Sequence, residues 1–267
     1  MIRALIVKGY GINCENEMGE ACRLAGAEPE FVHINEMIRP SFSLTPYRLL
    51  MLPGGFSFGD ELGAGKAFAN RLTYASQLKN DLQAFVDDGG CVLGICNGFQ
   101  LLVKLGLLPS GSQQSATLAP NDSNKFENRW SHHIVCDSRC VFTKGLEKLY
   151  LPVRHGEGKL LFQSPSMAKE LAEKGQVPLK YSDNEGNPTQ SYPDNPNGSP
   201  DAIAGICDPT GRILGMMAHP EAFTSILQHP SWTRKREIAI REKKPFDHIG
   251  DGLKLFHNVV NYLEDQT

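Results

Sequence analysis

The chain has 267 residues, of which 40% are hydrophobic and 21% charged, with a formal net charge of −3. This length can bury a large core, so we expect one domain over residues 1–267. The slightly negative net charge argues against a strongly basic surface that would bind nucleic acid. No apolar run approaches the roughly 18 residues that a membrane-spanning helix needs. The N-terminus shows no signal-peptide pattern, which indicates a cytoplasmic protein.

The cysteines indicate a reduced protein without a structural metal. Seven cysteines at irregular spacing do not form a disulfide framework. Cys136 and Cys140 make one close pair, but no second pair stands at zinc-ribbon spacing, and His132 and His133 do not complete a ligand set. We therefore predict no metal site.

The first half of the chain alternates strand-like and helix-like segments. Strand-like runs cover residues 4–8, 30–34 and 47–52, and apolar residues recur at helical spacing from Cys14 to Ala25, with Gly26 where a helix cap would stand. A further helical region, broken or continuous, is expected over residues 65–88. This alternation predicts a parallel βαβ sheet.

The segment Gly94-Ile95-Cys96-Asn97-Gly98 joins a short apolar strand to a helix. A nucleophile between two glycines at a strand-to-helix turn is typical of a sharp, strained elbow. Cys96 is expected to be exposed at this bend, at a helix N-terminus that favours the thiolate. The alternative is a buried structural cysteine.

The second half is predicted to be less regular and richer in antiparallel strands. Polar residues predict loops over 110–124 and 183–200. Runs 202–207 and 212–217 flank the turn sequence Asp-Pro-Thr-Gly and predict a hairpin that ends near His219. An apolar stripe from Leu253 to Leu263 predicts a closing helix that packs on the core.

A cysteine nucleophile needs a base and a group that orients the base. His155-Gly156-Glu157 and His219-Pro220-Glu221 both offer a histidine and a glutamate. The second follows a predicted strand and would emerge at a sheet end, so we assign His219 as base and Glu221 as its orienting partner. His155 and Glu157 are then predicted to line the site or to contact a partner.

An oxyanion needs two converging N–H donors. The glycine pair Gly54-Gly55 follows the third strand and leaves room for a backbone amide to point into a cleft. The amide of Asn97, directly after the nucleophile, would be the second donor. The alternative for the glycine pair is an ordinary turn.

A nucleotide site on this chain is not predicted. Gly63-Ala64-Gly65-Lys66 suggests a phosphate loop, but Asp60 replaces its first glycine and Ala67 its Ser or Thr. We expect no cofactor on this chain.

The three motifs together resemble class I glutamine amidotransferases. These enzymes combine a Pro-Gly-Gly loop, a Gly-x-Cys-x-Gly elbow with glutamine four residues after the cysteine, here Gln100, and a His-Pro-Glu segment. Further stretches, such as residues 54–60, 124–127 and 155–158, are similar to the glutaminase components of phosphoribosylformylglycinamidine synthase, over nearly the whole chain.

The resemblance implies a flavodoxin-like, mostly parallel sheet with helices on both faces and added antiparallel strands in the C-terminal half. It implies that Cys96, His219 and Glu221 hydrolyse L-glutamine, with Gly54, Gly55, Asn97 and Gln100 around the oxyanion and the substrate. Ammonia would pass to a synthetase subunit. With ATP and Mg²⁺, that subunit converts formylglycinamide ribonucleotide to formylglycinamidine ribonucleotide in de novo purine biosynthesis.

Departures from the family pattern leave some points open. Ala222 stands where arginine commonly follows the glutamate, and Arg234 or Arg236 would have to supply its contact. The chain is long for a separate subunit, and residues 195–200 are similar to the fused, single-chain enzyme. Whether a small adaptor subunit takes part is also open.

Two rival functions remain. One keeps the fold and makes Cys96 the nucleophile of a related cysteine hydrolase or peptidase, in which histidine often follows the cysteine directly; Asn97 stands there instead. The other is a non-enzymatic redox-sensing module.

Overall fold

A nine-stranded sheet forms the centre of the molecule, in the order β2-β1-β3-β4-β11-β10-β9-β6-β7, and β5 pairs with β8 outside it. The computed structural model describes residues 1–74, 78–111 and 113–266. Its strands are β1 (Arg3–Lys8), β2 (Glu28–His33), β3 (Leu49–Leu52), β4 (Cys91–Ile95), β5 (Ala116–Pro120), β6 (Glu127–Val135), β7 (Lys148–His155), β8 (Glu157–Phe162), β9 (Leu179–Ser182), β10 (Ile203–Cys207) and β11 (Ile213–Met216).

The strands from β2 to β11 in this order pair in parallel, which is the flavodoxin-like arrangement. Every residue of β3 and β4 is buried. Such continuous burial is expected of parallel strands whose two faces are both covered by helices. The predicted fold class is therefore confirmed.

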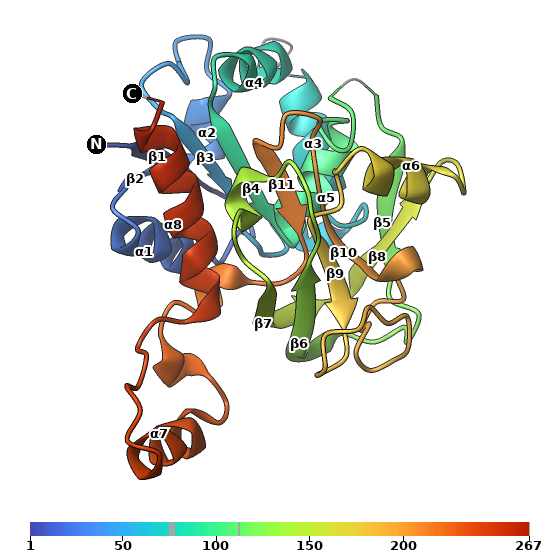
Figure 1. The fold of residues 1–267 in the computed structure, drawn as a ribbon. Coiled ribbons are helices and arrows are strands. Elements are labelled where there is room, and N and C mark those ends of the chain that lie inside the picture. Colours follow the sequence, from blue (N-terminus) through green and yellow to red (C-terminus); the bar gives the residue numbers. More distant parts are fainter. Residues whose placement is uncertain (75–77, 112, 267) are drawn as a thin grey trace.

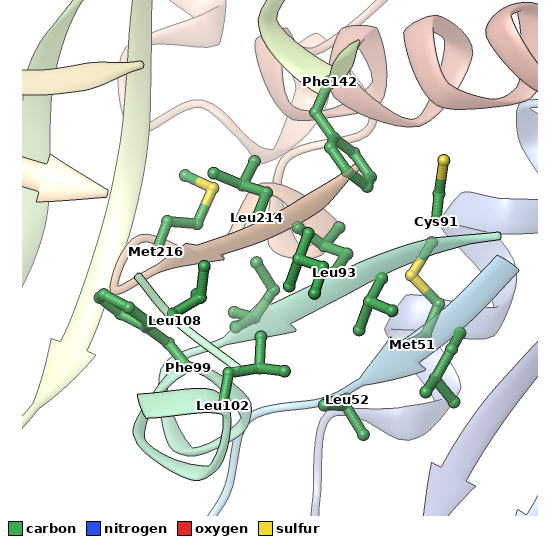
Figure 2. Close-up of a cluster of buried hydrophobic side chains, with 14 of the residues drawn as sticks. Met51, Leu52, Cys91, Leu93, Phe99, Leu102, Leu108, Phe142, Leu214 and Met216 are labelled. Atoms are coloured by element: carbon green, nitrogen blue, oxygen red, sulfur yellow. The ribbon is translucent and has the colours of Figure 1, made fainter. Parts of the chain in front are cut away.

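The helices are α1 (Glu15–Leu24), α2 (Ile34–Met37), α3 (Lys66–Tyr74), α4 (Leu78–Asp87), α5 (Asn97–Lys104), α6 (Met167–Glu173), α7 (Trp232–Arg241) and α8 (Asp251–Glu264). Helix α1 packs against α8, and α3 against α5 (Figure 1). Figure 2 shows Phe99 and Leu102 of α5 on one side of the central strands and Phe142 on the other. All three side chains are buried, so the core has two layers, one on each face of the sheet.

The predicted hairpin joins the two halves of the sheet. β10 and β11 pair antiparallel, with Gly205 opposite Met216 and Cys207 opposite Leu214. β11 also pairs in parallel with β4, with Ile95 opposite Met216. Since β4 and β11 end side by side, the residues that follow them, Cys96 and His219, reach the same edge of the sheet.

Two local predictions were wrong. Residues 116–120 lie in the predicted polar loop but form β5, because pairing with β8 supplies its hydrogen bonds. Cys14 was placed on the helix stripe but lies just before α1, with φ −108° and ψ 15°. Pairing between distant strands forms β5, and the backbone conformation of Cys14 sets the start of α1; hydrophobic periodicity alone predicts neither.

An arm over residues 224–250 projects from the body beside the start of α8 (Figure 1). At its base, Ser225 forms an isolated β-bridge with Ile249. Helix α7, in the arm, has no buried residue. Arg234 and Arg236 are exposed on it, and a role for either in place of the missing arginine remains a prediction. Among the described helices, none is long and apolar enough to cross a membrane.

Candidate active site

Cys96 occupies the predicted elbow between β4 and α5. Its backbone has φ 52° and ψ −105°, a region that non-glycine residues rarely adopt. A side chain at Gly98 would overlap the carbonyl oxygen of Leu52, so the helix can approach β3 this closely only through a glycine. The elbow is therefore both strained and tightly packed.

The prediction of an exposed Cys96 was wrong, because the residue is only 6% exposed. Its thiol lies 3.5 Å from the carbonyl oxygen of Arg154, at the end of β7. The elbow projects from the sheet as expected, but the antiparallel half covers it. The sulfur thus faces a polar backbone atom in a partly enclosed site.

His219 and Glu221 form a buried pair beside the elbow. The Nδ1 atom of His219 lies 2.6 Å from Oε1 of Glu221. The backbone N–H of His219 donates a hydrogen bond to the carbonyl oxygen of Pro152. Burial alone would lower the pKa of His219, but the Glu221 carboxylate and the thiols of Cys14 and Cys96 hold it well above its usual value. Among described residues, Nε2 has no hydrogen-bond partner, so it is free for proton transfer.

The Pro-Gly-Gly loop packs directly on this histidine. A side-chain carbon at Gly54 would lie 2.7 Å from Cε1 of His219 and 3.5 Å from Cβ of Cys96. Gly55 has φ +147°, which also favours glycine. Within the described part of the chain, the backbone N–H groups of Gly55 and Asn97 have no acceptor. They remain available to an oxyanion.

Comparison with known proteins supports the same chemistry. Residues 1–263 match the family of CobB/CobQ-like glutamine amidotransferase domains. The chain belongs to the glutamine amidotransferase family. It is 44% identical to the phosphoribosylformylglycinamidine synthase subunit PurQ of Methanococcus maripaludis, covering 98% of each, and 43% identical to PurQ of Dehalococcoides mccartyi, covering 98% and 97%.

A solved structure titled PurLQS from Thermotoga maritima also resembles this amidotransferase. It aligns with a TM-score of 0.72 and 28% identity over 98% of this chain and 99% of that one. The PurQ relatives are subunits of similar length, so the length of this chain does not single out the fused enzyme.

In this amidotransferase, Asn97 and Gln100 hold the site together. The Asn97 side chain accepts from the backbone N–H of Ser57 at 3.2 Å and donates to Oε1 of Gln100 at 2.9 Å. Gln100 in turn donates to the backbone carbonyl of Glu157 at 2.6 Å. These bonds tie the elbow to the glycine loop and to the 155–158 segment. A substrate contact by Gln100 remains a prediction.

The His155 ring is buried close to His219. Burial, and secondly the charge of His219, lower the pKa of His155 to about 3, so the ring is neutral. Its Nδ1 lies 3.0 Å from Oδ1 of Asn121, whose amide nitrogen donates to the carbonyl of His155 at 2.8 Å. Glu157 is half-buried and accepts from the N–H of Ala64. His155 therefore lies close to His219, and a role of His155 or Glu157 as site lining or partner contact remains a prediction.

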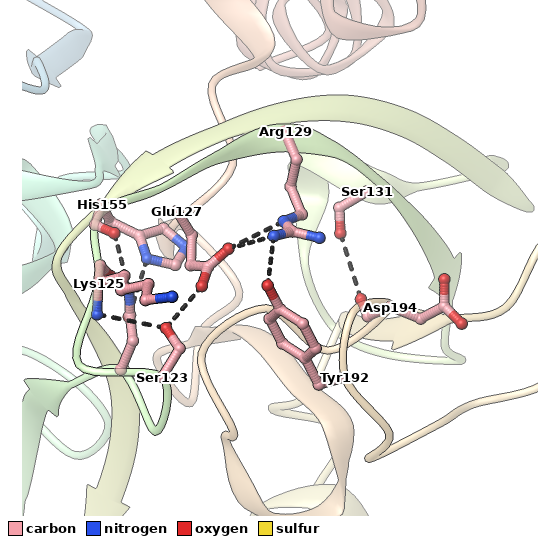
Figure 3. A network of polar contacts seen from close by, with 9 residues as sticks. Ser123, Lys125, Glu127, Arg129, Ser131, His155, Tyr192 and Asp194 are labelled. Atoms are coloured by element: carbon pink, nitrogen blue, oxygen red, sulfur yellow. Dashed lines mark hydrogen bonds and ion pairs between the residues drawn. The ribbon is translucent and has the colours of Figure 1, made fainter.

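Polar contacts fix the segment from Ser123 to Arg129, which follows Asn121 in the chain, and Figure 3 shows them. Glu127 is buried and accepts two bonds from Arg129 and one from Ser123. Arg129 also donates to the hydroxyl of Tyr192 at 2.7 Å. A buried carboxylate with this many donors is compensated, so the network holds β6 and the 183–200 loop against the segment that supports His155.

Cys14 is a site residue that the sequence analysis missed. Its Sγ lies 3.9 Å from Nδ1 of His219, and its backbone N–H donates to the carbonyl of Gly54. The position of Cys14 in the sequence could have predicted this, because Cys14 follows the first parallel strand and side chains after such strands gather at one edge of the sheet. Cys14 also fits the apolar spacing of the first helix, so it was assigned to that helix instead.

Proposed function

We propose that this chain is the glutaminase subunit of phosphoribosylformylglycinamidine synthase. The observation that carries the proposal is the arrangement of Cys96, His219 and Glu221 beside two backbone N–H groups that have no acceptor among the described residues, in a chain 44% identical to PurQ. A nucleophile, an oriented base and an oxyanion site are the parts that acyl transfer requires.

In the first step, the Cys96 thiolate attacks the side-chain carboxamide carbon of glutamine. The N–H groups of Gly55 and Asn97 stabilise the oxyanion; in other enzymes one such donor is worth roughly 2.7–4 kcal/mol. The raised pKa of His219 suits it to hold a proton beside a thiolate. His219 passes that proton to the departing ammonia from Nε2, which leaves a glutamyl thioester on Cys96.

In the second step, neutral His219 takes a proton from water, which attacks the thioester carbonyl. The tetrahedral intermediate collapses, glutamate leaves, and the proton returns to the Cys96–His219 pair. Glu221 keeps Nδ1 occupied throughout, so that Nε2 faces the reacting atoms. His155 takes no part in these proton transfers, because its pKa of about 3 keeps the ring neutral at neutral pH.

Ammonia needs an acceptor, and the synthetase subunit supplies it. We place ATP and Mg²⁺ on that partner and no cofactor on this chain.

Phe56 and Phe126 are 48% and 52% exposed, with ring centroids 6.1 Å apart, and Phe56 directly follows Gly55. This apolar pair beside the oxyanion loop is suited to cover by the partner. All seven cysteines are free thiols, in keeping with the cytoplasm.

The test compares variants in the complex with the synthetase. Cys96→Ser is expected to bind glutamine but to lose all but about a thousandth of glutaminase turnover, since losing a covalent nucleophile costs orders of magnitude. Cys136→Ser, at another thiol, serves as control. A Cys96→Ser rate above about a tenth of wild type contradicts the proposal. A glutamine-analogue electrophile should label Cys96 stoichiometrically; absence of labelling would favour a redox-sensing module.

A further inference from the structure

Cys14 brings a second thiol to the pair of His219 and Glu221, and no bond of the proposed reaction forms or breaks on it. It is half-exposed, whereas His219 and Glu221 are almost completely buried. Its Sγ lies 3.3 Å from Oδ1 of Asn13 and 3.9 Å from Nδ1 of His219. The thiol thus lies between solvent and the buried pair.

The three side chains have the chemistry and spacing of a metal-ligand set. One ligand atom each from Cys14, His219 and Glu221 lie within 4.8 Å of one another. Oε2 of Glu221 is buried and has no hydrogen-bond partner among the described residues. A thiolate, an imidazole and a carboxylate are the ligands that Zn²⁺ takes, and three protein ligands leave a fourth position for water.

We propose that Cys14, His219 and Glu221 form a binding site for a thiolate-seeking divalent cation such as Zn²⁺, which reversibly inhibits the glutaminase. Binding forms one bond from each side chain to the cation and releases two protons to solvent, one from the thiol of Cys14 and one from Nδ1 of His219. The inhibitory part rests on the proposed function; the binding part does not.

Geometry explains why occupation would stop the reaction. Nitrogen and oxygen ligands about 2.1 Å from a tetrahedral Zn²⁺ lie roughly 3.4 Å apart. In the structure, Nδ1 of His219 and Oε1 of Glu221 are 2.6 Å apart and hydrogen-bonded. A cation bound to both atoms would separate them, and a cation on Nδ1 would in any case replace the proton that this nitrogen shares with Glu221, so the bond that orients the base is lost. Mg²⁺, which prefers oxygen ligands, should not bind there.

The binding test uses the full-length chain with Cys96→Ser, so that the nucleophile cannot supply a sulfur ligand. Cd²⁺ is the probe, followed by the ultraviolet band of its thiolate bond and by calorimetry. We expect one bound equivalent, and an affinity lowered about tenfold or more when Cys14→Ser is added. Cys136→Ser, at the other half-exposed thiol, should not change it. Unchanged affinity in the Cys14 variant would overturn the site.

The inhibition test uses the complex with Cys96 intact, and each variant is compared with its own metal-free rate. The Zn²⁺ concentration for half-inhibition should rise about tenfold or more in Cys14→Ser, and a chelator should restore wild-type activity. An equal midpoint would overturn the inhibitory role, since Zn²⁺ would then act through Cys96. Cys14→Ala provides a second variant if the serine protein does not fold. Failure of glutaminase activity itself would leave the Cd²⁺ result intact, so the two proposals fail separately.

Discussion

The backbone strain at Cys96 predicts an unusual order of stabilities among variants of this residue. Cys96→Ala and Cys96→Gly both remove the sulfur, but only glycine adopts φ 52°, ψ −105° without strain. Such strain costs about 1–3 kcal/mol, whereas glycine in an ordinary position is about 0.5–1 kcal/mol less stable than alanine. Cys96→Gly should therefore be about 0–2.5 kcal/mol more stable than Cys96→Ala.

Urea and thermal denaturation of the two variants measure this difference, at about 2 °C of melting temperature per kcal/mol for a chain of this size. Ala84→Gly on the exposed side of α4 is the control and should lose about 1 kcal/mol. The reasoning is refuted if Cys96→Gly is less stable than Cys96→Ala by the ordinary margin, because the elbow would then hold no strain.

Three further predictions concern a close contact, a buried titrating group and the arm. Gly54→Ala puts a carbon 2.7 Å from the His219 ring, so glutaminase activity should fall about a hundredfold. Among the described residues, the new carbon of Gly156→Ala would meet Phe126 alone, at 3.9 Å, so this variant should retain glutaminase activity; equal losses in the two variants would contradict the prediction. Burial lowers the pKa of His133 to about 4. At pH values below about 6.5, the pKa of histidine in an unfolded chain, the unfolded state therefore binds more protons than the folded state. The free energy of unfolding then decreases as the pH is lowered. From pH 7 to 5, urea denaturation should show His133→Leu losing about 2 kcal/mol less than wild type; parallel losses would disprove the assignment. Finally, limited trypsin digestion of the isolated subunit should cut first in α7, which buries no residue, and first cuts in the sheet would refute this.

The sequence predicted those parts of the fold that depend on local pattern. The parallel strands, the elbow at Cys96, the 202–217 hairpin and the His-Pro-Glu segment each have a short-range signature, and all lie where expected. The position of the candidate site could be predicted because the residues that follow parallel strands meet at one edge of the sheet.

The missed features depend on contacts between distant segments. The burial of Cys96 comes from the antiparallel half, in particular Arg154 at the end of β7. The strand β5 exists because β8 lies beside it. Cys14 joins the site only because the first loop packs on Gly54. None of these contacts has a signature in the nearby sequence.

The strand that delivers His219 lies in the middle of the sheet, between β4 and β10, although it comes late in the chain. During synthesis, the nucleophile therefore leaves the ribosome more than a hundred residues before its base. A growing or truncated chain that ends before β11 has a thiol but no proton donor, and its sheet lacks the strand that joins the two halves. The proposed hydrolysis of glutamine therefore requires that synthesis has passed His219 and that β11 has entered the sheet.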